Sequence, residues 1–450
     1  MKTMTKMLAT AVAAALLGVA APASAKLTDA EAARLGADLT PLGGEKAGNK
    51  DGTIPAWTGG MCSPPAGWNP AQGYVDPFAS DKVLFTITKA NAAQYKDKLS
   101  PGTLAMLNKY DTFKMPVYQT RRTACHPQEA YDLIKSMATK IELQGFGYTG
   151  GFAYTPFPIP KNGLEAIWNH APRYLGGGVK RQYNSFPVRA NGDYYKIATE
   201  ERRVFYRNLD TPQDNLLGVY SARFLAPATL EGTVFLVHEP IDQVKQSRSA
   251  WIYNAGQRRV RRAPDLAYDN INDGTEGLRT TDQFDGYNGA PDRYDWKLIG
   301  KQEIYVPYNA FKLSDKKLRY KEDVIRKGTL NSDLMRYELH RVWVVEANLK
   351  AGSKHVYGKR VFYMDEDTWT VLYEDAYDTR KQLWRVGIHP LMQFYDAKVP
   401  WYRANIWHDL TNGSYLMANL DNEIKTAWSF GEKATWAEFQ PDALRRAGTK

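Results

Sequence analysis

Short stretches in which apolar and polar residues alternate dominate the chain after about residue 183, and this period of two is typical of β-strands. The segment 341–347, RVWVVEA, is one example, and hairpin-length sequences such as LKAGSKH and DEDTW separate such stretches. Because adjacent strands with short links run antiparallel, the pattern predicts an antiparallel sheet and no βαβ units.

Sequences that start helices stand mainly before this region. Thr28 and Glu31 fit a capping box, in which each side chain accepts from the other residue's backbone N–H. Further helices are predicted to begin near Ser100, Pro127, Gly163 and Pro441. The predicted strands are residues 194–208, 216–225, 231–238, 249–253, 258–262, 296–306, 340–349, 354–364, 370–375, 383–388 and 414–419.

This change of pattern divides the chain into four parts. Residues 1–25 read as a signal peptide, and residues 26–182 as a helical and irregular region that packs on the sheet. Residues 183–432 form the predicted antiparallel sheet domain, and residues 433–450 a C-terminal helix and tail. No internal repeat is found.

The first part has the features of a secretory signal peptide. Lys2 and Lys6 give a positive start, residues 7–20 form an apolar run, and the sequence ASA ending at Ala25 fits a cleavage site. The run is shorter than the roughly 20 residues that span a bilayer, and no later segment approaches that length. No Cys follows the cleavage site, which argues against a lipid anchor. We expect a periplasmic protein that begins at Lys26 and does not span the membrane, with outer-membrane association as a further expectation.

Glycine, proline, asparagine and aspartate dominate residues 39–60, which argues against regular structure there. Ile54 and Trp57 are the expected anchors of this segment. The chain has two cysteines, Cys62 and Cys125. An exported protein with an even number of cysteines typically keeps them oxidised. We predict a Cys62–Cys125 disulfide, with two separate buried thiols as the alternative.

Basic residues outnumber acidic ones, since 59 Lys and Arg face 49 Asp and Glu, a net charge of +10. The signal peptide removes two lysines and no acid, which leaves +8 on the mature chain. This balance favours an anionic partner, and export argues against nucleic acid.

Signatures of enzymes and metal sites are weak. The chain has no Rossmann or P-loop glycine pattern and no G-x-S-x-G nucleophile motif. The acidic trio at 365–367 sits where a hairpin must turn, so we expect a solvated turn and not a catalytic carboxylate pair. The sequence therefore predicts no metal, cofactor or catalytic residue. No metal-ligand spacing such as HExxH links the seven histidines, His126, His170, His238, His340, His355, His389 and His408.

Four of the five residues at 258–262 are arginines, directly after a strand-like WIY sequence. In a strand, Arg258 and Arg262 face one way and Arg259 and Arg261 the other, so neither face of the segment is fully buried. Two interpretations remain open. The arginines either form a binding edge for phosphate or carboxylate headgroups, or pair with acidic neighbours such as Asp265, Asp269, Asp292 and Asp295.

Six blocks of sequence, in this order, carry a family resemblance: LTPLGGEKAGNKDGTIPAWTGG, PFPIPKNGLEAIWNH, WIYNAGQRRVRRAPDLAYD, DRYDWKLIGKQEIYVPYNAF, RVWVVEANLKAGSKHVYGKRVFYMDEDTW and YDTRKQLWRV. The chain resembles an uncharacterised family of secreted Gram-negative proteins, described as similar to the outer-membrane lipoprotein-sorting carriers LolA and LolB. The resemblance implies an α+β fold, in which helices cover a large curved antiparallel sheet, an incomplete barrel, and enclose an apolar cavity. It also implies envelope transporters and outer-membrane proteins as partners.

The chain departs from LolA and LolB by its long N-terminal region, its predicted disulfide and its lack of a lipidated Cys, which argues for a cargo other than lipoproteins. We expect a non-enzymatic periplasmic carrier or accessory factor for a lipid or other hydrophobic ligand in envelope transport. The alternatives are an envelope hydrolase whose active site forms only in three dimensions, and a polysaccharide-binding or structural surface protein. Expected to face the cavity are Trp251, Tyr253, Trp343, Val345 and Phe362, and expected to meet a headgroup or partner are Arg258, Arg259, Arg261 and Arg262.

Overall fold

The computed structural model describes residues 26–448 except residues 212, 244, 265, 267, 272, 426 and 427. The signal peptide predicted at residues 1–25 lies outside the described residues. Within the described part of the chain, no helix combines the length and apolar character needed to cross a bilayer.

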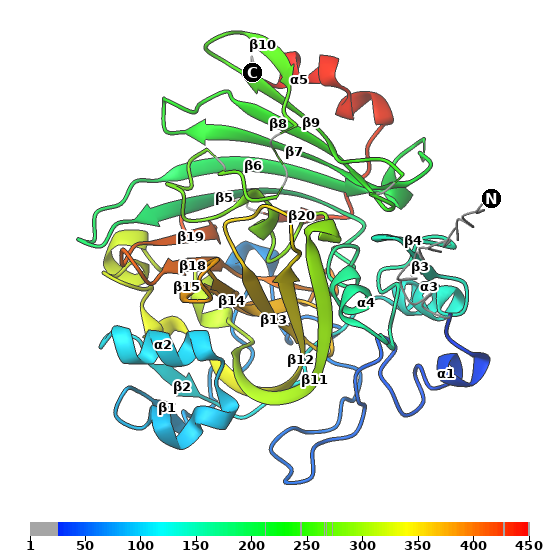
Figure 1. The fold of residues 1–450 in the computed structure, drawn as a ribbon. Coiled ribbons are helices and arrows are strands. Elements are labelled where there is room, and N and C mark those ends of the chain that lie inside the picture. Colours follow the sequence, from blue (N-terminus) through cyan, green and yellow to red (C-terminus); the bar gives the residue numbers. More distant parts are fainter. Residues whose placement is uncertain are drawn as a thin grey trace, which may run out of the picture.

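A sheet of sixteen strands runs through the described residues (Figure 1). Its strands are β1 Phe85–Ile87, β2 Met115–Val117, β5 Gly178–Val188, β6 Ile197–Phe205, β7 Leu216–Ala226, β8 Val234–Pro240, β9 Ser249–Asn254, β10 Arg259–Arg262, β11 Tyr294–Pro307, β12 Tyr337–Leu349, β13 Lys359–Asp365, β14 Val371–Tyr377, β15 Leu383–Ile388, β18 Asn405–Asp409, β19 Tyr415–Leu420 and β20 Trp428–Phe430. Two separate hairpins are β3 Glu142–Gln144 with β4 Gly147–Thr149, and β16 Leu391–Phe394 with β17 Val399–Tyr402.

The sheet is open and almost entirely antiparallel. Its strand order is β1-β2-β12-β13-β14-β15-β18-β19-β5-β6-β7-β8-β9-β10, with β11 on β12 and β20 on β5. Only β2 and β12 meet in parallel, through Val117 and Tyr337. Because the order runs from β1 to β10 without those two strands pairing, the sheet does not close into a barrel. The predicted open antiparallel sheet is confirmed.

The helices are short, and those that begin at Pro101, Gly163 and Pro441 contact strands of the sheet. They are α1 Asp29–Ala33, α2 Pro101–Lys109, α3 Gln128–Met137, α4 Gly163–Trp168 and α5 Pro441–Gly448. The other helical turns are Pro70–Gln72, Ala92–Lys98, Tyr206–Asn208, Thr281–Gln283, Pro291–Arg293, Phe311–Ser314, Tyr320–Val324, Ser332–Leu334 and Trp436–Phe439. The capping box of Thr28 and Glu31 is present, and the predicted helix starts are confirmed.

Strands β1 and β2 come from the part predicted to be helical and irregular, yet they join the large sheet beside β12. The strand-rich part begins with β5 at Gly178, slightly before the expected boundary. Both parts therefore contribute strands to one sheet. The division into residues 26–182, 183–432 and 433–450 as separate domains stays a prediction.

Cys62 and Cys125 form the predicted disulfide, with 5.4 Å between their Cα atoms. The irregular segment before it is held as expected. Ile54 is 1% exposed in a core that contains strand residues, and Trp57 donates from Nε1 to the Ala124 carbonyl at 3.0 Å.

The acidic turn between β13 and β14 is buried, so the prediction of a solvated turn was wrong. Asp365, Glu366 and Asp367 are each at most 4% exposed. The backbone N–H of Glu45 donates to Glu366 at 3.1 Å, and Arg122 donates twice to Asp367, at 2.8 and 2.6 Å. The N-terminal segment thus covers this turn from a distance of 321 positions in the sequence, which no local pattern reveals.

Helix α5 covers one face of strands β8, β9 and β10 (Figure 1). Leu444 of α5 and Phe439 just before it belong to one core cluster with Leu236 of β8 and Tyr253 of β9. The opposite face of this part of the sheet is therefore the one left for other contacts.

Candidate ligand-binding site

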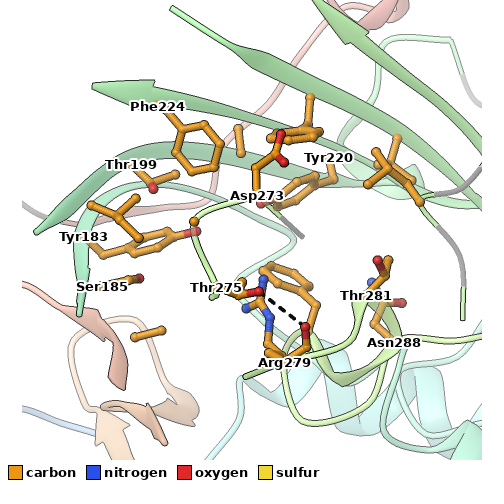
Figure 2. Close-up of a pocket in the computed structure, with 18 of the residues that line it drawn as sticks. Tyr183, Ser185, Thr199, Tyr220, Phe224, Asp273, Thr275, Arg279, Thr281 and Asn288 are labelled. Atoms are coloured by element: carbon orange, nitrogen blue, oxygen red, sulfur yellow. Dashed lines mark hydrogen bonds between the residues drawn. The ribbon is translucent and has the colours of Figure 1, made fainter. Parts of the chain in front are cut away.

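A pocket lies between strands β5–β8 and the described residues of segment 266–288, which fold back over them (Figure 2). The space open to the centre of a water molecule is about 110 Å³, several times the ~10–15 Å³ that one water needs. The strands and β19 contribute Tyr183, Ser185, Ile197, Thr199, Tyr220, Ala222, Phe224, Phe235, Val237, Glu239, Leu416 and Ala418, and the remaining lining residues are Arg248, Leu266, Asp273, Gly274, Thr275, Arg279, Thr281, Phe284 and Asn288.

Alternation along the strands brings the lining side chains to one face. On β8, Phe235, Val237 and Glu239 line the pocket, whereas Leu236 between them packs in the core under α5. Most strand residues of the lining are apolar or aromatic. Such a concave apolar site with few polar groups is typical of small-molecule binding.

The cover of the pocket differs from the expected one. The family resemblance implied helices over the open side of the sheet, but the described residues of segment 266–288 are irregular apart from the turn Thr281–Gln283. Arg248 fixes this segment, because it donates to the carbonyls of Asn288 at 2.6 Å and Leu266 at 3.3 Å. The same Arg248 pairs with Glu239 at 2.8 Å, so these two charges neutralise each other.

Arg279 projects from the covering segment into the pocket (Figure 2) and has no such partner. Its guanidinium lies 5.4 Å from the ring centroid of Phe284 and 5.2 Å from that of Trp407. Its Nε is buried without a hydrogen-bond partner, and no carboxylate of the described residues pairs with it. Burial lowers the pKa of Arg279, and the nearby Tyr183, Tyr220 and Glu201 partly oppose this effect.

Two tyrosines lie on the strand side of the same pocket. Burial raises the pKa of Tyr183 to about 12 and holds the pKa of Tyr220 well above its ordinary value. Both side chains therefore keep their protons at neutral pH and present neutral hydroxyl groups.

Two smaller cavities, of about 30 and 10 Å³, continue from the pocket along the sheet toward α4. The first shares Tyr220, Glu239 and Asn288 with the main pocket, and also touches Arg203 and Asp285. The three spaces form one interrupted path along the sheet.

Buried ion pairs lie beside this path. Arg181 pairs with Glu201 at 2.9 Å, and Arg173 and Arg203 share Asp285 at 3.0 and 2.9 Å. Each of these five residues is at most 8% exposed. Buried charges of this kind are stable only when they are paired.

Trp251 and Tyr253, predicted to face the cavity, lie on the opposite face of β9. Tyr253 is 1% exposed in the core under α5, and the Trp251 ring lies 4.8 Å from the ring of His238. Neither residue lines the pocket. The alternation correctly predicted that the two residues share one face of the strand. It did not indicate which face of the strand lines the pocket.

Trp343, Val345 and Phe362 lie in a different part of the molecule, on β12 and β13. Val345 and Phe362 are fully buried in the core that also contains residues of α4. Trp343 packs against this core and stacks on Trp369 at 5.8 Å. All three pack in or against this core, and none of them lines the pocket. The residues that line the pocket are therefore not the predicted ones.

The arginines at 258–262 lie at the open edge of the sheet, because β10 pairs with β9 alone among the described strands. Arg258, Arg259, Arg261 and Arg262 are exposed. None of them forms an ion pair with a described residue; Asp269 instead pairs with Arg293 at 3.5 Å. Asp265 lies outside the described residues. The geometry favours a binding edge over structural pairing.

One group in the described part of the chain has the proximity of metal ligands: His340, Asp365 and Asp367, whose ligand atoms lie within 4.8 Å of one another. Its members have other partners, since Arg122 holds Asp367 and His340 lies 3.0 Å from Glu338. Burial raises the pKa of Asp365 above its usual range. An ion-pair network accounts for this group.

Solved structures share part of the fold. A Vibrio parahaemolyticus domain named for outer membrane lipoprotein sorting aligns with a TM-score of 0.43 and 15% identity, over 61% of this chain and 94% of that one. A LolA superfamily protein from Nitrosomonas europaea aligns with a TM-score of 0.38 and 11% identity, over 62% of this chain and 98% of that one. Likenesses at this level carry no functional argument.

Sequence comparison places the chain more firmly. An uncharacterised protein of Pseudomonas aeruginosa is 48% identical over 458 residues, with 100% of both chains covered. The family model described as a protein of unknown function (DUF1329) matches residues 86–445. The resemblance drawn from the six sequence blocks is confirmed, and the chain belongs to the DUF1329 family.

Proposed function

We propose that the protein is a non-enzymatic periplasmic carrier or accessory factor, which binds a lipid or another hydrophobic molecule in the pocket under segment 266–288. The pocket itself carries this proposal, because it is a largely apolar space on the inner face of an open sheet. The signal peptide predicted from the sequence supports export. Envelope transporters or outer-membrane proteins would then receive or supply the ligand.

The size of the pocket sets the scale of affinity. Each buried methylene contributes ~0.8 kcal/mol, so an apolar tail of about six carbons contributes roughly 5 kcal/mol before ordering costs. A free energy of about 4 kcal/mol corresponds to a Kd of about 1 mM. A dissociation constant well below the millimolar range therefore requires polar contacts in the same pocket.

The lining offers little for catalysis. Among its described residues there is no histidine and no cysteine. Ser185 and the threonines of the lining therefore have no histidine beside them to activate a hydroxyl nucleophile, and the carboxylate of Glu239 is held by Arg248 at 2.8 Å. This supports a binding role over hydrolysis.

The surface offers little for sugar stacking. No Trp, Tyr or Phe within the described ranges is fully solvent-exposed. A polysaccharide platform needs aromatic rings whose faces are open to solvent. This supports ligand binding in the pocket under segment 266–288.

A pair of alanines on adjacent strands gives the test. Ala222 lines the pocket, whereas Ala198 alternates with the lining residues Ile197 and Thr199 and so points away from it. We expect Ala222→Trp to weaken binding of the neutral fluorescent probe N-phenyl-1-naphthylamine by about tenfold or more, and Ala198→Trp to change it less than about twofold.

Two results would overturn the proposal. One is equal probe binding by the wild type and Ala222→Trp. The other is the absence of any bound lipid in native mass spectra of the protein purified from its own periplasm, together with no probe binding.

A further inference from the structure

Arg279 places a positive charge in the pocket, and no carboxylate of the described residues forms an ion pair with it. Its guanidinium is packed against Phe284 and Trp407, whose rings provide cation–π contact but accept no hydrogen bond from Nε. An aromatic ring offsets part of the cost of removing an arginine from water. It does not replace a carboxylate or phosphate, which accepts two hydrogen bonds from one guanidinium.

The surrounding charges do not compensate Arg279 either. The arginines on this side of the sheet are Arg173, Arg181, Arg203 and Arg279, and the carboxylates among them are Glu201 and Asp285. Both carboxylates already pair with other arginines, Asp285 with two of them and Glu201 with Arg181 through Oε2. Oε1 of Glu201 has no hydrogen-bond partner, and Glu201 forms no ion pair with Arg279, on which it acts only at longer range. The neighbouring His170 and His389 carry no charge at neutral pH, because burial lowers the pKa of each to about 3.

Two other acids line the pocket, and neither serves Arg279. Glu239 is bound to Arg248 at 2.8 Å. Asp273 is exposed and forms no ion pair with Arg279. The described residues therefore leave an excess of positive charge on the walls of an apolar space.

We infer that the pocket takes an anionic amphiphile, whose oxyanion headgroup, a carboxylate or phosphate, binds the guanidinium of Arg279 while its apolar tail lies against strands β6–β8. The hydroxyls of Tyr183 and Tyr220 face Arg279 across the pocket (Figure 2) and add neutral donors for the same headgroup. The inference rests on the proposed function, since it names the ligand class of the same site. It places the headgroup at Arg279 and not at the exposed arginines of 258–262.

Matched ligands of ten carbons test the charge: decanoate, decyl phosphate and neutral decan-1-ol. We expect the wild type to bind the two anions about tenfold or more tightly than the alcohol, measured by displacement of N-phenyl-1-naphthylamine. The better of the two anions identifies the headgroup. Arg279→Met keeps the side chain's apolar packing and removes the charge, so it should abolish the preference for anions and leave alcohol binding within about threefold.

Two further variants separate charge from structure. Arg279→Lys keeps a cation and should retain part of the preference for anions. Arg319→Gln removes an exposed arginine that is not in the pocket lining, and should change neither ligand. In the absence of ligand, Arg279→Met should unfold at a temperature no lower than the wild type, because it removes an uncompensated charge.

An unchanged preference for anions in Arg279→Met, or equal binding of decanoate, decyl phosphate and decan-1-ol by the wild type, would overturn the inference while leaving the carrier proposal intact. Failure of the wild type to bind any of the three ligands or the neutral probe would overturn the carrier proposal itself.

Discussion

The carboxylate of Asp375 on β14 accepts a hydrogen bond from the backbone N–H of Gly102 in α2, at 3.0 Å. Both residues are buried. A Cβ at position 102 would lie 2.0 Å from Oδ1 of the same carboxylate and 3.0 Å from Val386. The first turn of α2 therefore lies on β14 in a way that requires glycine at this position.

Gly102→Ala should destabilise the protein, although alanine is ordinarily the better helix former by about 1 kcal/mol. The added methyl group collides with a buried carboxylate that cannot move aside, and overpacking of this kind costs roughly 1–3 kcal/mol. Urea unfolding measures the loss. Asn108→Ala, at an exposed position of the same helix, should stay within about 0.5 kcal/mol of the wild type, and a Gly102→Ala protein as stable as this control would contradict the assignment.

Asp375 should also make stability depend on pH. Burial raises its pKa to about 7 from 3.8, although hydrogen bonds from Gly102 and Ser100 lower it. The folded protein thus holds this proton more tightly than the unfolded chain does. The stabilisation is complete below pH 3.8 and is lost as the pH rises through 7, at up to ~1.4 kcal/mol per pH unit.

Asp375→Asn mimics the protonated acid and cannot ionise. We expect its free energy of unfolding to fall less steeply between pH 4.5 and 7 than that of the wild type, so that its relative stability is greatest at pH 8. Urea unfolding at pH 4.5, 6 and 8 gives the slopes. Asp111→Asn, at a side chain that is 87% exposed, should keep the wild-type slope; equal slopes for all three proteins would disprove the role of Asp375.

Local sequence was sufficient where the structure is locally determined. The helix starts at Thr28 and Ser100 were predictable because a capping side chain bonds a backbone N–H three residues away. Strand β12 was predictable within a few residues because polar and apolar residues alternate over 341–347. No strand beginning at Gly178 was predicted, although β5 begins there. Its polar residues Asn184 and Ser185 are both buried, so this strand lacks the alternation of polar and apolar residues that marks the others.

The pocket was not predictable, because its walls meet through the fold alone. Alternation on β9 put Trp251 and Tyr253 on one face, and α5, near the end of the chain, decides that this face is the covered one. Arg279 stands in a turn-rich sequence without periodicity. Its environment needs Trp407, from a strand far along the chain, and no spacing rule connects the two.

Removal of the disulfide should lower stability. Cys62 and Cys125 are 63 positions apart, and the chain-entropy model gives roughly 4 kcal/mol for closing a loop of that length. The Cys62→Ala/Cys125→Ala protein should therefore unfold at a lower urea concentration than the oxidised wild type. Wild-type protein reduced with dithiothreitol serves as the control and should behave like the double variant. Equal midpoints before and after reduction would refute the expected contribution.

The charge excess beside the pocket predicts a large effect at Glu201, which is fully buried and binds Arg181 at 2.9 Å. Glu201→Gln leaves a buried arginine without a counter-ion and should cost roughly 3–5 kcal/mol. Glu200→Gln, at the next residue on the partly exposed face of β6, should cost less than about 0.5 kcal/mol. A Glu201→Gln protein that unfolds with the Glu200→Gln control would contradict the pairing.

Burial lowers the pKa of Arg279, and the same carboxylate opposes this effect, so the two sites should be coupled. Glu201→Gln leaves the buried arginines repelling Arg279 without a carboxylate between them. Removing the charge of Arg279 relieves part of this repulsion. We therefore expect the Glu201→Gln/Arg279→Met protein to be more stable than the sum of its single variants predicts, by about 0.5–3 kcal/mol. A double-mutant cycle from urea unfolding of the four ligand-free proteins measures this term. Strict additivity would show that Arg279 is screened from the buried arginines, and the charge excess would then no longer explain why the pocket needs an anion.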